Sequence, residues 1–273
     1  MSSILTNNSA MVALATLNQV NKGLNETQNR VSSGLKIRSG KENAAYFAIS
    51  ETMSGDSSMF KSINESLTLT KNAVSTARLG AETVKDLAQQ FVDRVAFAQG
   101  TGINLADVQT ELTSLVDQMT LAIDQSTFNG ADLVNATTAV TVVAGVTRTG
   151  GTFATTTITF NQVDLGAIKT ALSAIDLTTS TDLQADLTTA EGQLANAISA
   201  ATSLGVTEKT LESQQTFLDA LTDTLDSGIS GMVDANMEEE AARLQAYQVQ
   251  QQLATQSLSI ANQTPQNILS LFR

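Results

Sequence analysis

The sequence contains no cysteine and no histidine. These absences remove disulfides, the thiolate and imidazole metal ligands, and the commonest general base of enzymes. A nucleophilic Ser or Thr would have to rely on Lys or a carboxylate for activation. We therefore expect packing alone to hold the fold, and we expect no metal site, no cofactor and no enzymatic activity.

Large and rigid side chains are also scarce. Tryptophan is absent, proline occurs once and aromatic residues make up 4% of the chain. Any core must then be built from Leu, Val, Ile and Ala, a composition typical of long helices packed side by side. The apolar fraction of 42% is adequate for burial, and 273 residues suffice for about two domains.

Positive charge is in deficit, with 15 Lys and Arg against 27 Asp and Glu and a net charge of -12. This balance argues against partners with anionic surfaces, namely nucleic acids and acidic membranes. No apolar run reaches the length of a membrane span, and the first residues hold no basic group followed by an apolar stretch. We therefore expect no membrane insertion and no cleavable signal peptide.

A long helix is predicted in the second quarter of the chain, where apolar or small residues recur at alternating steps of four and three. This seam is Ile63, Leu67, Thr70, Val74, Ala77, Ala81, Val84, Ala88, Phe91 and Val95. A period of 3.5 residues keeps one stripe against a partner helix in a left-handed supercoil. The helix is expected to end near Gly100 and Gly102.

Two further seams predict helices that pack against the first one. The earlier seam stops at the turn formed by residues 127–130 and consists of Val108, Leu112, Leu115, Met119 and Ala122. The short break before it suits an antiparallel helical hairpin. The later seam consists of Leu204, Leu211, Leu218 and Leu225, with Ala201 and Ile229 in the complementary position.

Both ends of the chain also have helical spacing, but their seams are thinner. The apolar members are Leu14, Leu17, Leu24, Val31 and Leu35 at one end, and Met237, Leu244 and Leu258 at the other. Asn21, Gln28, Gln248 and Gln251 are predicted to occupy seam positions, where polar residues specify register at a cost in stability. Frayed ends of one bundle are the alternative interpretation.

Between Ala136 and Leu183 the composition shifts to Thr, Val and Gly, and we expect no helical spacing there. Val140, Val142, Ala144 and Val146 alternate with other residues, as do Thr156, Ile158 and Phe160, on either side of Gly150 and Gly151. This pattern is typical of a β-hairpin. A small β-rich insertion is therefore predicted to interrupt a helical framework.

One cluster of charge invites a chemical interpretation. Glu238, Glu239 and Glu240 are consecutive, and consecutive residues on a helix point about 100° apart, so they cannot converge on one ion. We expect a solvated, negatively charged helix start. The glycines of the insertion lack the Lys and helix start of a phosphate loop and are expected to lie in turns.

Three groups of residues resemble one known family. Residues 30–37 (RVSSGLKI) are similar to the N-terminal signature of bacterial flagellins, although residues 40–46 (GKENAAY) depart from the family's usual continuation. Residues 127–130 (TFNG) resemble a turn of the family. Residues 233–240 (VDANMEEE), residues 261–266 (ANQTPQ) and the final Leu271-Phe272-Arg273 resemble its C-terminal end.

The resemblance implies a mainly α-helical fold in which long antiparallel coiled-coil helices form a rod and the N- and C-terminal helices pair. It implies an inner domain (1–42 with 234–273), a rod domain (43–135 with 184–233) and an outer insertion (136–183). It also implies export without a cleavable signal peptide and growth of an extracellular filament. Expected partners are further copies of the chain, the export apparatus, an export chaperone, and hook-associated and cap proteins.

We predict that the assembly interface of such a polymer is formed by the apolar residues of the two ends. The predicted residues are Leu14, Leu17, Leu24, Val31, Leu35, Met237, Leu244, Leu258, Leu271 and Phe272. Two other functions remain open from sequence, a hook-filament junction protein and a cytoplasmic coiled-coil adaptor. The adaptor explains the seams but not the motifs at both ends.

Overall fold

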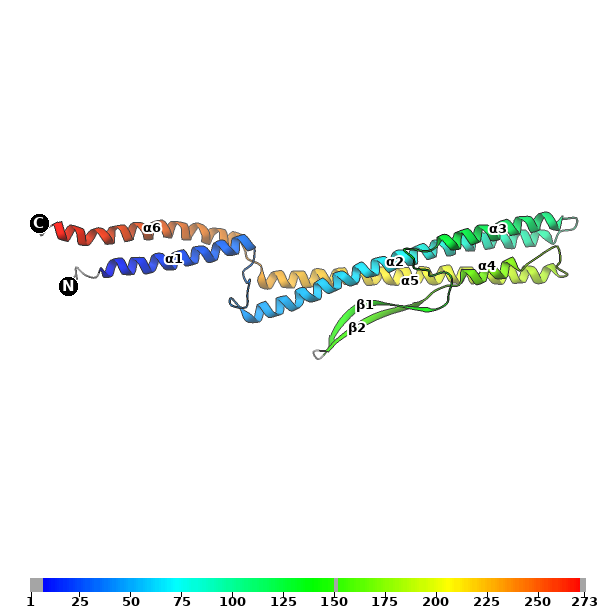
Figure 1. The fold of residues 1–273 in the computed structure, drawn as a ribbon, viewed down its shortest axis with the longest axis horizontal. Coiled ribbons are helices and arrows are strands. Elements are labelled where there is room, and N and C mark those ends of the chain that lie inside the picture. Colours follow the sequence, from blue (N-terminus) through cyan, green and yellow to red (C-terminus); the bar gives the residue numbers. More distant parts are fainter. Residues whose placement is uncertain (1–6, 150–151, 271–273) are drawn as a thin grey trace. The chain divides into compact units, whose positions relative to one another are not determined.

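The computed structural model describes residues 7–149 and 152–270. In chain order they form α1 (Asn8–Ser33), α2 (Ala44–Ala98), α3 (Leu105–Gln125), β1 (Ala139–Thr149), β2 (Thr152–Asn161), α4 (Leu165–Ser173), α5 (Leu183–Val233) and α6 (Met237–Ser270), as Figure 1 shows. The predicted fold class is confirmed, because the chain is mainly α-helical with long antiparallel helices and a single two-stranded hairpin in the described part.

Each of these helices begins directly after an Asn or Asp whose side chain accepts a hydrogen bond from the first turn. Such a cap satisfies a backbone N–H that has no partner within the helix. The six capping residues are Asn7, Asn43, Asn104, Asp164, Asp182 and Asn236. At the other end of α1, Gly34 takes a left-handed conformation with φ 72° and its N–H donates to the carbonyl of Arg30.

The contacts divide the chain into two compact units, which we call the first unit (1–56 with 224–273) and the second unit (57–223). Both α2 and α5 contribute residues to each unit. The division into three domains that the sequence suggested remains a prediction.

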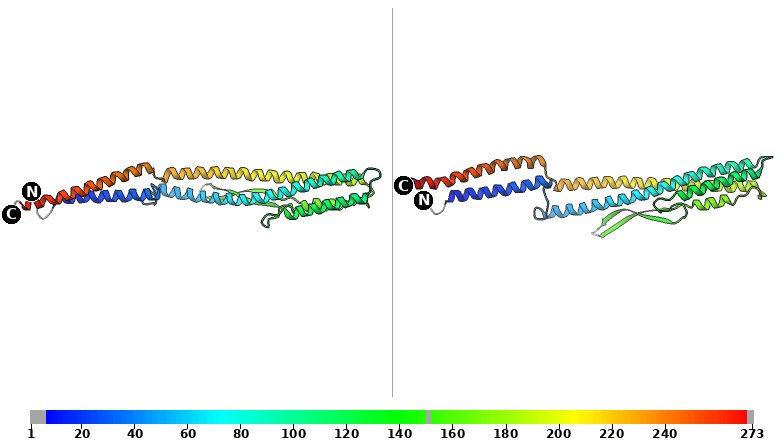
Figure 2. Two further views of the ribbon diagram at one scale, coloured as in Figure 1. Left: turned by 90° about the horizontal axis from the view of Figure 1, so that it is seen from above. Right: turned by 45° about the horizontal axis from the view of Figure 1, so that its top comes forward.

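In the second unit, α2 and α5 run antiparallel and bury the seams predicted for them (Figures 1 and 2). From α2, Leu67, Val74, Val84 and Phe91 are buried, together with Ala77, Ala81, Ala88 and Val95. Leu204, Leu211 and Leu218 of α5 are buried as well. Ile63, Thr70 and Ala201 are only half-buried, and so are Leu225 and Ile229, which belong to the first unit.

The predicted end of α2 and the predicted seam of α3 are also confirmed, with one shift. α2 ends at Ala98, and Val108, Leu112, Leu115 and Met119 are buried in α3. At the last turn Ile123 is buried, and Ala122 is half-buried, because the larger side chain completes the core. The turn after α3 uses Asn129 (φ 50°) and Gly130 (φ 79°), both left-handed, as expected for Asn-Gly.

The hairpin of β1 and β2 is antiparallel and places Val140 opposite Phe160 and Val142 opposite Ile158. A β-bulge interrupts the register between Val143 and Gly145, and the carbonyl of Ala144 at this bulge accepts a hydrogen bond of 2.8 Å from Gln214 of α5. A side chain of the helical framework therefore anchors the irregular point of the hairpin.

The expectation of no helical spacing between Ala136 and Leu183 is wrong for α4. This helix buries Leu165, Ile168 and Leu172, which follow a three-four spacing, and it packs on α3. Gln109 of α3 then binds the chain that follows, because its amide donates to the carbonyl of Ile175 and accepts from the N–H of Leu177. The short, Thr-flanked segment lacked the length that makes helical spacing recognisable.

Threonines are frequent on the exposed faces of the helices, and their hydroxyls are bonded locally. Many donate to the carbonyl four residues earlier, at distances of 2.7–3.1 Å, including Thr68, Thr83, Thr110, Thr202 and Thr216. These hydroxyls are thereby satisfied within their own helix.

Candidate functional site

The terminal helices α1 and α6 lie side by side and antiparallel in the first unit (Figures 1 and 2). On α1 the buried or half-buried residues at this spacing are Ala13, Leu17, Val20, Leu24, Thr27 and Val31. On α6 they are Glu240, Leu244, Tyr247, Gln251, Ala254, Leu258 and Ala261. Both sets follow the four-three spacing of a coiled-coil seam.

The structure brings together some of the predicted interface residues and leaves others outside the seam. Leu17, Leu24, Val31, Leu244 and Leu258 lie in it and are half-buried. Leu35 follows α1 and forms an antiparallel bridge with Asp234. Leu14 and Met237 are 48% and 46% exposed. Leu271 and Phe272 lie outside the described residues. Whether this set forms an assembly interface remains a prediction.

The frame predicted for the terminal helices was partly wrong. The positions of Leu17, Leu24 and Leu244 are correct, but the complementary positions are shifted by one residue. Val20 and Thr27 of α1 are buried, whereas Gln28 and Gln248 are exposed. Helix geometry permits a neighbour at either three or four residues, and packing against α6 selects the alternative that the sequence did not favour.

Asn21 lies beside the seam and not in it, because Val20 takes the predicted position, but it still meets Gln251 across the pair. The Gln251 amide donates to the Asn21 carbonyl oxygen at 2.7 Å. Near the other end of α6, the Asn7 amide donates to the backbone carbonyl of Ala261 at 2.8 Å. Polar contacts therefore accompany the thin apolar seam along the pair.

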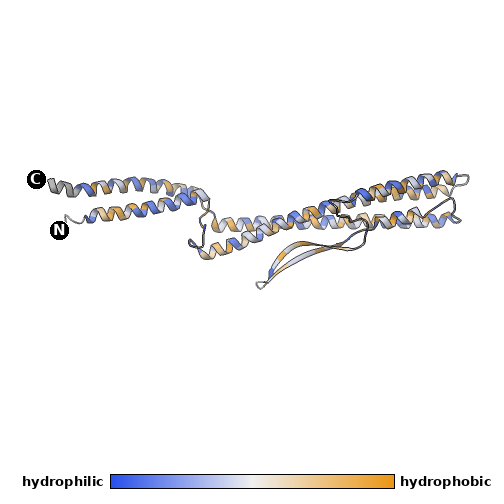
Figure 3. Cartoon of the chain, viewed as in Figure 1, coloured by the Kyte–Doolittle hydropathy of each residue, from blue (hydrophilic) through white to orange (hydrophobic). Residues whose placement is uncertain are grey.

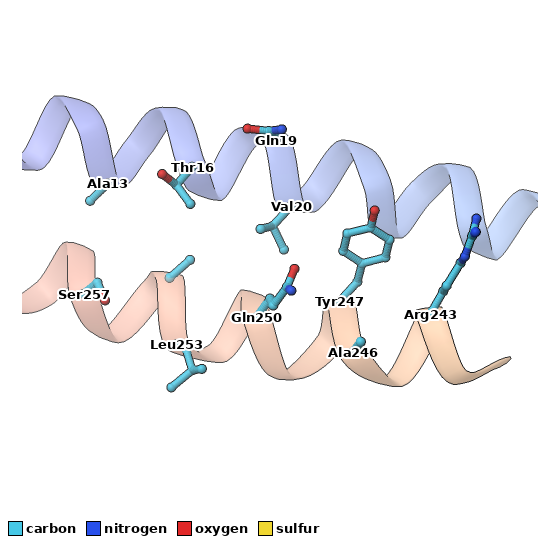
Figure 4. Close-up of a pocket in the computed structure, with 11 residues that line it drawn as sticks. Ala13, Thr16, Gln19, Val20, Arg243, Ala246, Tyr247, Gln250, Leu253 and Ser257 are labelled. Atoms are coloured by element: carbon cyan, nitrogen blue, oxygen red, sulfur yellow. The ribbon is translucent and has the colours of Figure 1, made fainter. Parts of the chain in front are cut away.

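Tyr247 lies against the one glycine of α1. A Cβ atom at Gly23 would lie 2.7 Å from the Tyr247 Cζ atom and 2.8 Å from Cε1, too close for any real contact. Figure 4 shows the Tyr247 ring pointing from α6 toward α1. The missing side chain at Gly23 thus forms a notch that the ring occupies.

Glu240 is buried, contrary to the expectation of a solvated glutamate cluster. Its side chain is 7% exposed, and its Oε1 atom lies 3.4 Å from Arg30 of α1 and 3.5 Å from Arg243. Glu238 and Glu239 are exposed as predicted. The third glutamate is buried because it reaches the seam position at the start of α6, where two guanidinium groups compensate its charge.

A groove of about 850 Å³ runs along the pair of helices. Its lining includes Ala13, Thr16, Val20, Ala254 and Ser257, and Arg243 is the sole charged residue of this lining. In Figure 4, Val20 and Gln250 point into the space between the helices, and Leu253 points away from α1. Among the described residues, no three carboxylates converge in a way that could hold a metal ion.

Beyond the seam, the paired helices expose large apolar side chains. Met11 and Val12 of α1 are 62% and 61% exposed, and Val249, Leu253 and Ile260 of α6 are 55%, 58% and 61% exposed. Exposed apolar side chains of this size are candidates for contacts between molecules. Sequence reasoning missed them because it looked for a single stripe on each helix.

A signal for this surface was present in the sequence. Residues 1–21 and 244–272 contain no Asp, Glu, Lys or Arg, although such residues make up 15% of the chain. Figure 3 shows apolar and polar bands alternating along α1 and α6. No helix in the described part of the chain is long and apolar enough to cross a membrane.

Comparisons with known proteins match both ends of the chain. A family model described as the bacterial flagellin N-terminal helical region matches residues 4–139, and one for the C-terminal helical region matches residues 187–272. The unmatched residues between them include β2 and α4.

Individual proteins are similar over the whole chain. A flagellin of Brucella melitensis is 37% identical over 281 residues, with 100% of both chains covered. Flagellin FljM of Caulobacter vibrioides is 34% identical, with 100% of this chain and 99% of the relative covered. A crystal structure of Bacillus cereus flagellin is 16% identical and covers 66% of this chain and 94% of its own, with a TM-score of 0.35. Assignment to a family therefore rests on the sequence similarity to these relatives and not on the solved structure.

Proposed function

The chain belongs to the bacterial flagellin family, whose members are structural subunits of the flagellar filament, and on that premise we propose that copies of it pack against one another through the paired helices α1 and α6. The interface comprises the predicted apolar residues of both ends together with the exposed residues Met11, Val12, Val249, Leu253 and Ile260. The protein acts by polymerising and not by catalysis.

The observation that best supports this interface is that exposed apolar side chains lie on the ends of the chain that carry no charge. Every copy carries a net charge of -12, so identical surfaces that meet in a polymer would repel each other wherever they hold like charges. Residues 1–21 and 244–272 avoid this repulsion because they carry no charged side chain, and they hold all the interface residues except Leu24, Val31, Leu35 and Met237. Burying one exposed Leu there would contribute about 1.5 to 3 kcal/mol.

Export and cellular partners follow from the family premise. We propose that the chain leaves the cell without a cleaved signal peptide, through the flagellar export apparatus and with the help of an export chaperone. Assembly then takes place outside the cell, in contact with hook-associated and cap proteins. A hook-filament junction protein and a cytoplasmic adaptor are not favoured, because the relatives similar over the whole chain are flagellins.

Substitution of Leu253 tests the interface. Leu253 is 58% exposed in the single chain, so Leu253→Lys should leave its helices intact while placing a charge where neighbouring copies meet. We expect electron microscopy after seeding to show long filaments for the native chain and none for Leu253→Lys. Leu253→Gln, which removes apolar area without adding charge, should assemble only at a higher subunit concentration.

Ala241→Lys is the matched control, because Ala241 is an exposed residue of the same helix in its charged first turns. This variant should form filaments. Circular dichroism should report equal helix content for all four proteins. Normal filaments from Leu253→Lys at the native subunit concentration would contradict the proposed interface.

A further inference from the structure

The apolar seam between α1 and α6 defines its register only weakly. On α1, Leu17, Leu24 and Val31 are spaced by seven residues. On α6, Leu244 and Leu258 follow the same spacing, with Gln251 midway between them. A shift of seven residues therefore presents a similar apolar pattern to the partner helix. The buried seam residues of α1, Val20 and Thr27, are too small to form distinctive knobs.

Four contacts that do not involve the Leu and Val residues of the seam agree on one register. They join Asn7 to Ala261, Asn21 to Gln251, Gly23 to Tyr247, and Arg30 to Glu240, and the residue numbers of each pair add to between 268 and 272. They differ in kind, comprising two hydrogen bonds, one steric notch and one ion pair. Their agreement on the register does not depend on the packing of the Leu and Val residues of the seam.

A shift of seven residues in one direction is incompatible with three of these contacts. Tyr247 would then face Thr16 instead of the notch at Gly23. Glu240 would face Gly23, leaving a buried carboxylate without Arg30, which is costly in a low-dielectric site. Gln251 would face Leu14.

A shift in the opposite direction fails for related reasons. Tyr247 would face Arg30, where there is no notch for the ring. Glu240 would face Ile37, beyond the end of α1, and would again lose its partner in that helix. Only the amide of Gln251, which would meet Gln28, would regain a polar neighbour.

We propose that Asn21, Gly23 and Arg30 of α1, with Gln251, Tyr247 and Glu240 of α6, form a register lock. This lock permits one antiparallel alignment of the terminal helices and excludes those displaced by a heptad. It sets the alignment of α1 and α6 and is distinct from the surface that meets other copies.

Cysteine cross-linking tests the lock directly, because the native chain has no cysteine. Ala13→Cys with Ser257→Cys reports the native register, since both residues line the groove, their numbers add to 270, and they lie at the same level along the pair in Figure 4. Val20→Cys with Ser257→Cys and Ala13→Cys with Gln250→Cys report the two shifted registers. In the native register the latter pairs are about 10 Å apart along the axis, too far for a disulfide.

Each reporter pair is oxidised in the full chain after seeding, because the terminal helices are expected to be firmly ordered only in the polymer. Links within one chain are separated by mass from links between chains. On the native background we expect only the 13–257 link. The triple substitution Asn21→Leu, Tyr247→Leu and Gln251→Leu removes the hydrogen bond and the aromatic ring of the proposed lock and leaves apolar side chains at these positions. We expect the shifted links to rise at least tenfold. An unchanged pattern would overturn the proposal. Loss of all links would show that these residues hold the pair together without setting its register, which also overturns it.

Gly23→Ala supplies a second test that leaves every polar contact in place. The added methyl group should reduce the 13–257 link severalfold, and Tyr247→Ala in the same chain should restore it. Gly55→Ala is the matched control, since Gly55 is also helical, lies in the first unit and has no atom within 4 Å of where an added Cβ would lie. An unchanged 13–257 link in Gly23→Ala would overturn the role of the notch.

Discussion

At the scale of single residues, close packing in the second unit depends on the absence of a side chain at Gly80. A Cβ atom there would lie 1.8 Å from the Ser126 Oγ atom and 2.6 Å from its Cβ atom. We expect Gly80→Ala to lower the free energy of unfolding by about 1 to 3 kcal/mol, as overpacking does. Urea denaturation followed by circular dichroism measures the change.

The control is Gly192→Ala, also within a long helix, where no atom lies within 4 Å of the added Cβ. Because Ala favours a helix over Gly by about 1 kcal/mol, this variant should be slightly more stable. Ser126→Gly should restore stability to Gly80→Ala. Equal stability of the two alanine variants would show that α2 and the end of α3 are not closely packed.

Glu42 provides a prediction about protonation. Its carboxylate accepts a 2.6 Å hydrogen bond from the Arg38 backbone N–H and a second one from the guanidinium, which together hold the pKa of Glu42 below its ordinary value of 4.5. The stability that this carboxylate contributes is present above the unfolded-state pKa. It is lost as the pH falls through the lower folded-state pKa.

NMR titration measures this pKa in the native chain and in two variants. The backbone hydrogen bond is the largest cause of the shift, so Arg38→Ala should retain most of it. Arg38→Pro, which removes the N–H group, should bring the pKa back toward 4.5. The assignment fails if Arg38→Ala alone abolishes the shift.

At the scale of elements, the terminal helices have too little buried surface to be stable outside the polymer. Val20 and Thr27 are the buried residues of the described part of α1. A few buried side chains do not offset a backbone entropy of about 1 to 2 kcal/mol for each ordered residue. We therefore predict that α1 and α6 become firmly ordered only on assembly. Limited proteolysis should trim unassembled subunits up to roughly residue 43 and back to roughly residue 233, whereas filaments resist.

Leu258→Lys tests the same point by substitution. Leu258 is a half-buried seam residue, and a lysine there has to lose its water shell only when the end is packed. The variant should fail to assemble, while the second unit unfolds in urea as it does in the native chain. Equal protease resistance of both ends in subunits and filaments would mean that the ends are already folded before assembly.

The hairpin is the element whose removal we expect the fold to tolerate. Thr138 and Gln162, at its base, are joined by a backbone hydrogen bond of 3.0 Å and a side-chain bond of 2.6 Å, so the chain can be closed there at low entropic cost. A chain lacking Val140 to Phe160 should still form filaments. Loss of the buried Phe160 should lower its melting temperature. Soluble or unfolded protein alone would make the hairpin part of the framework.

The long helix α2 and the terminal helix α1 differ in how well their seams can be predicted from the sequence. The seam of α2 was predictable because its four-three spacing runs without a break from Ile63 to Val95 along one long helix. The frame of α1 was predictable only at Leu17, Leu24 and Val31. Val20 lies three residues after Leu17 and Asn21 lies four residues after it, so either could occupy the next seam position. Packing against α6 selects Val20. The notch at Gly23 and the burial of Glu240 depend on a partner helix far away in sequence.

At the scale of the whole molecule, the distribution of charge separates two roles. Apart from Arg273, all charged side chains lie between Lys22 and Arg243. Solubility is therefore supplied by the middle of the chain, and the ends are left free to meet identical ends. Periodicity alone did not reveal this division, because a seam is defined by apolar residues and says nothing about missing charge.

The threonine hydroxyls bonded to their own helix backbones have a consequence for any neighbour that packs on those faces. A long side chain such as Lys or Glu gives up about 1.5 to 2 kcal/mol of rotamer entropy when a partner immobilises it. In a threonine such as Thr83 or Thr202, the hydroxyl already donates to the carbonyl four residues earlier, at 2.9 or 2.8 Å. Contact with a partner therefore costs this side chain little rotamer entropy and dehydrates no unbonded donor. These faces are preorganised, and contact with a second subunit orders almost nothing that is not already in place.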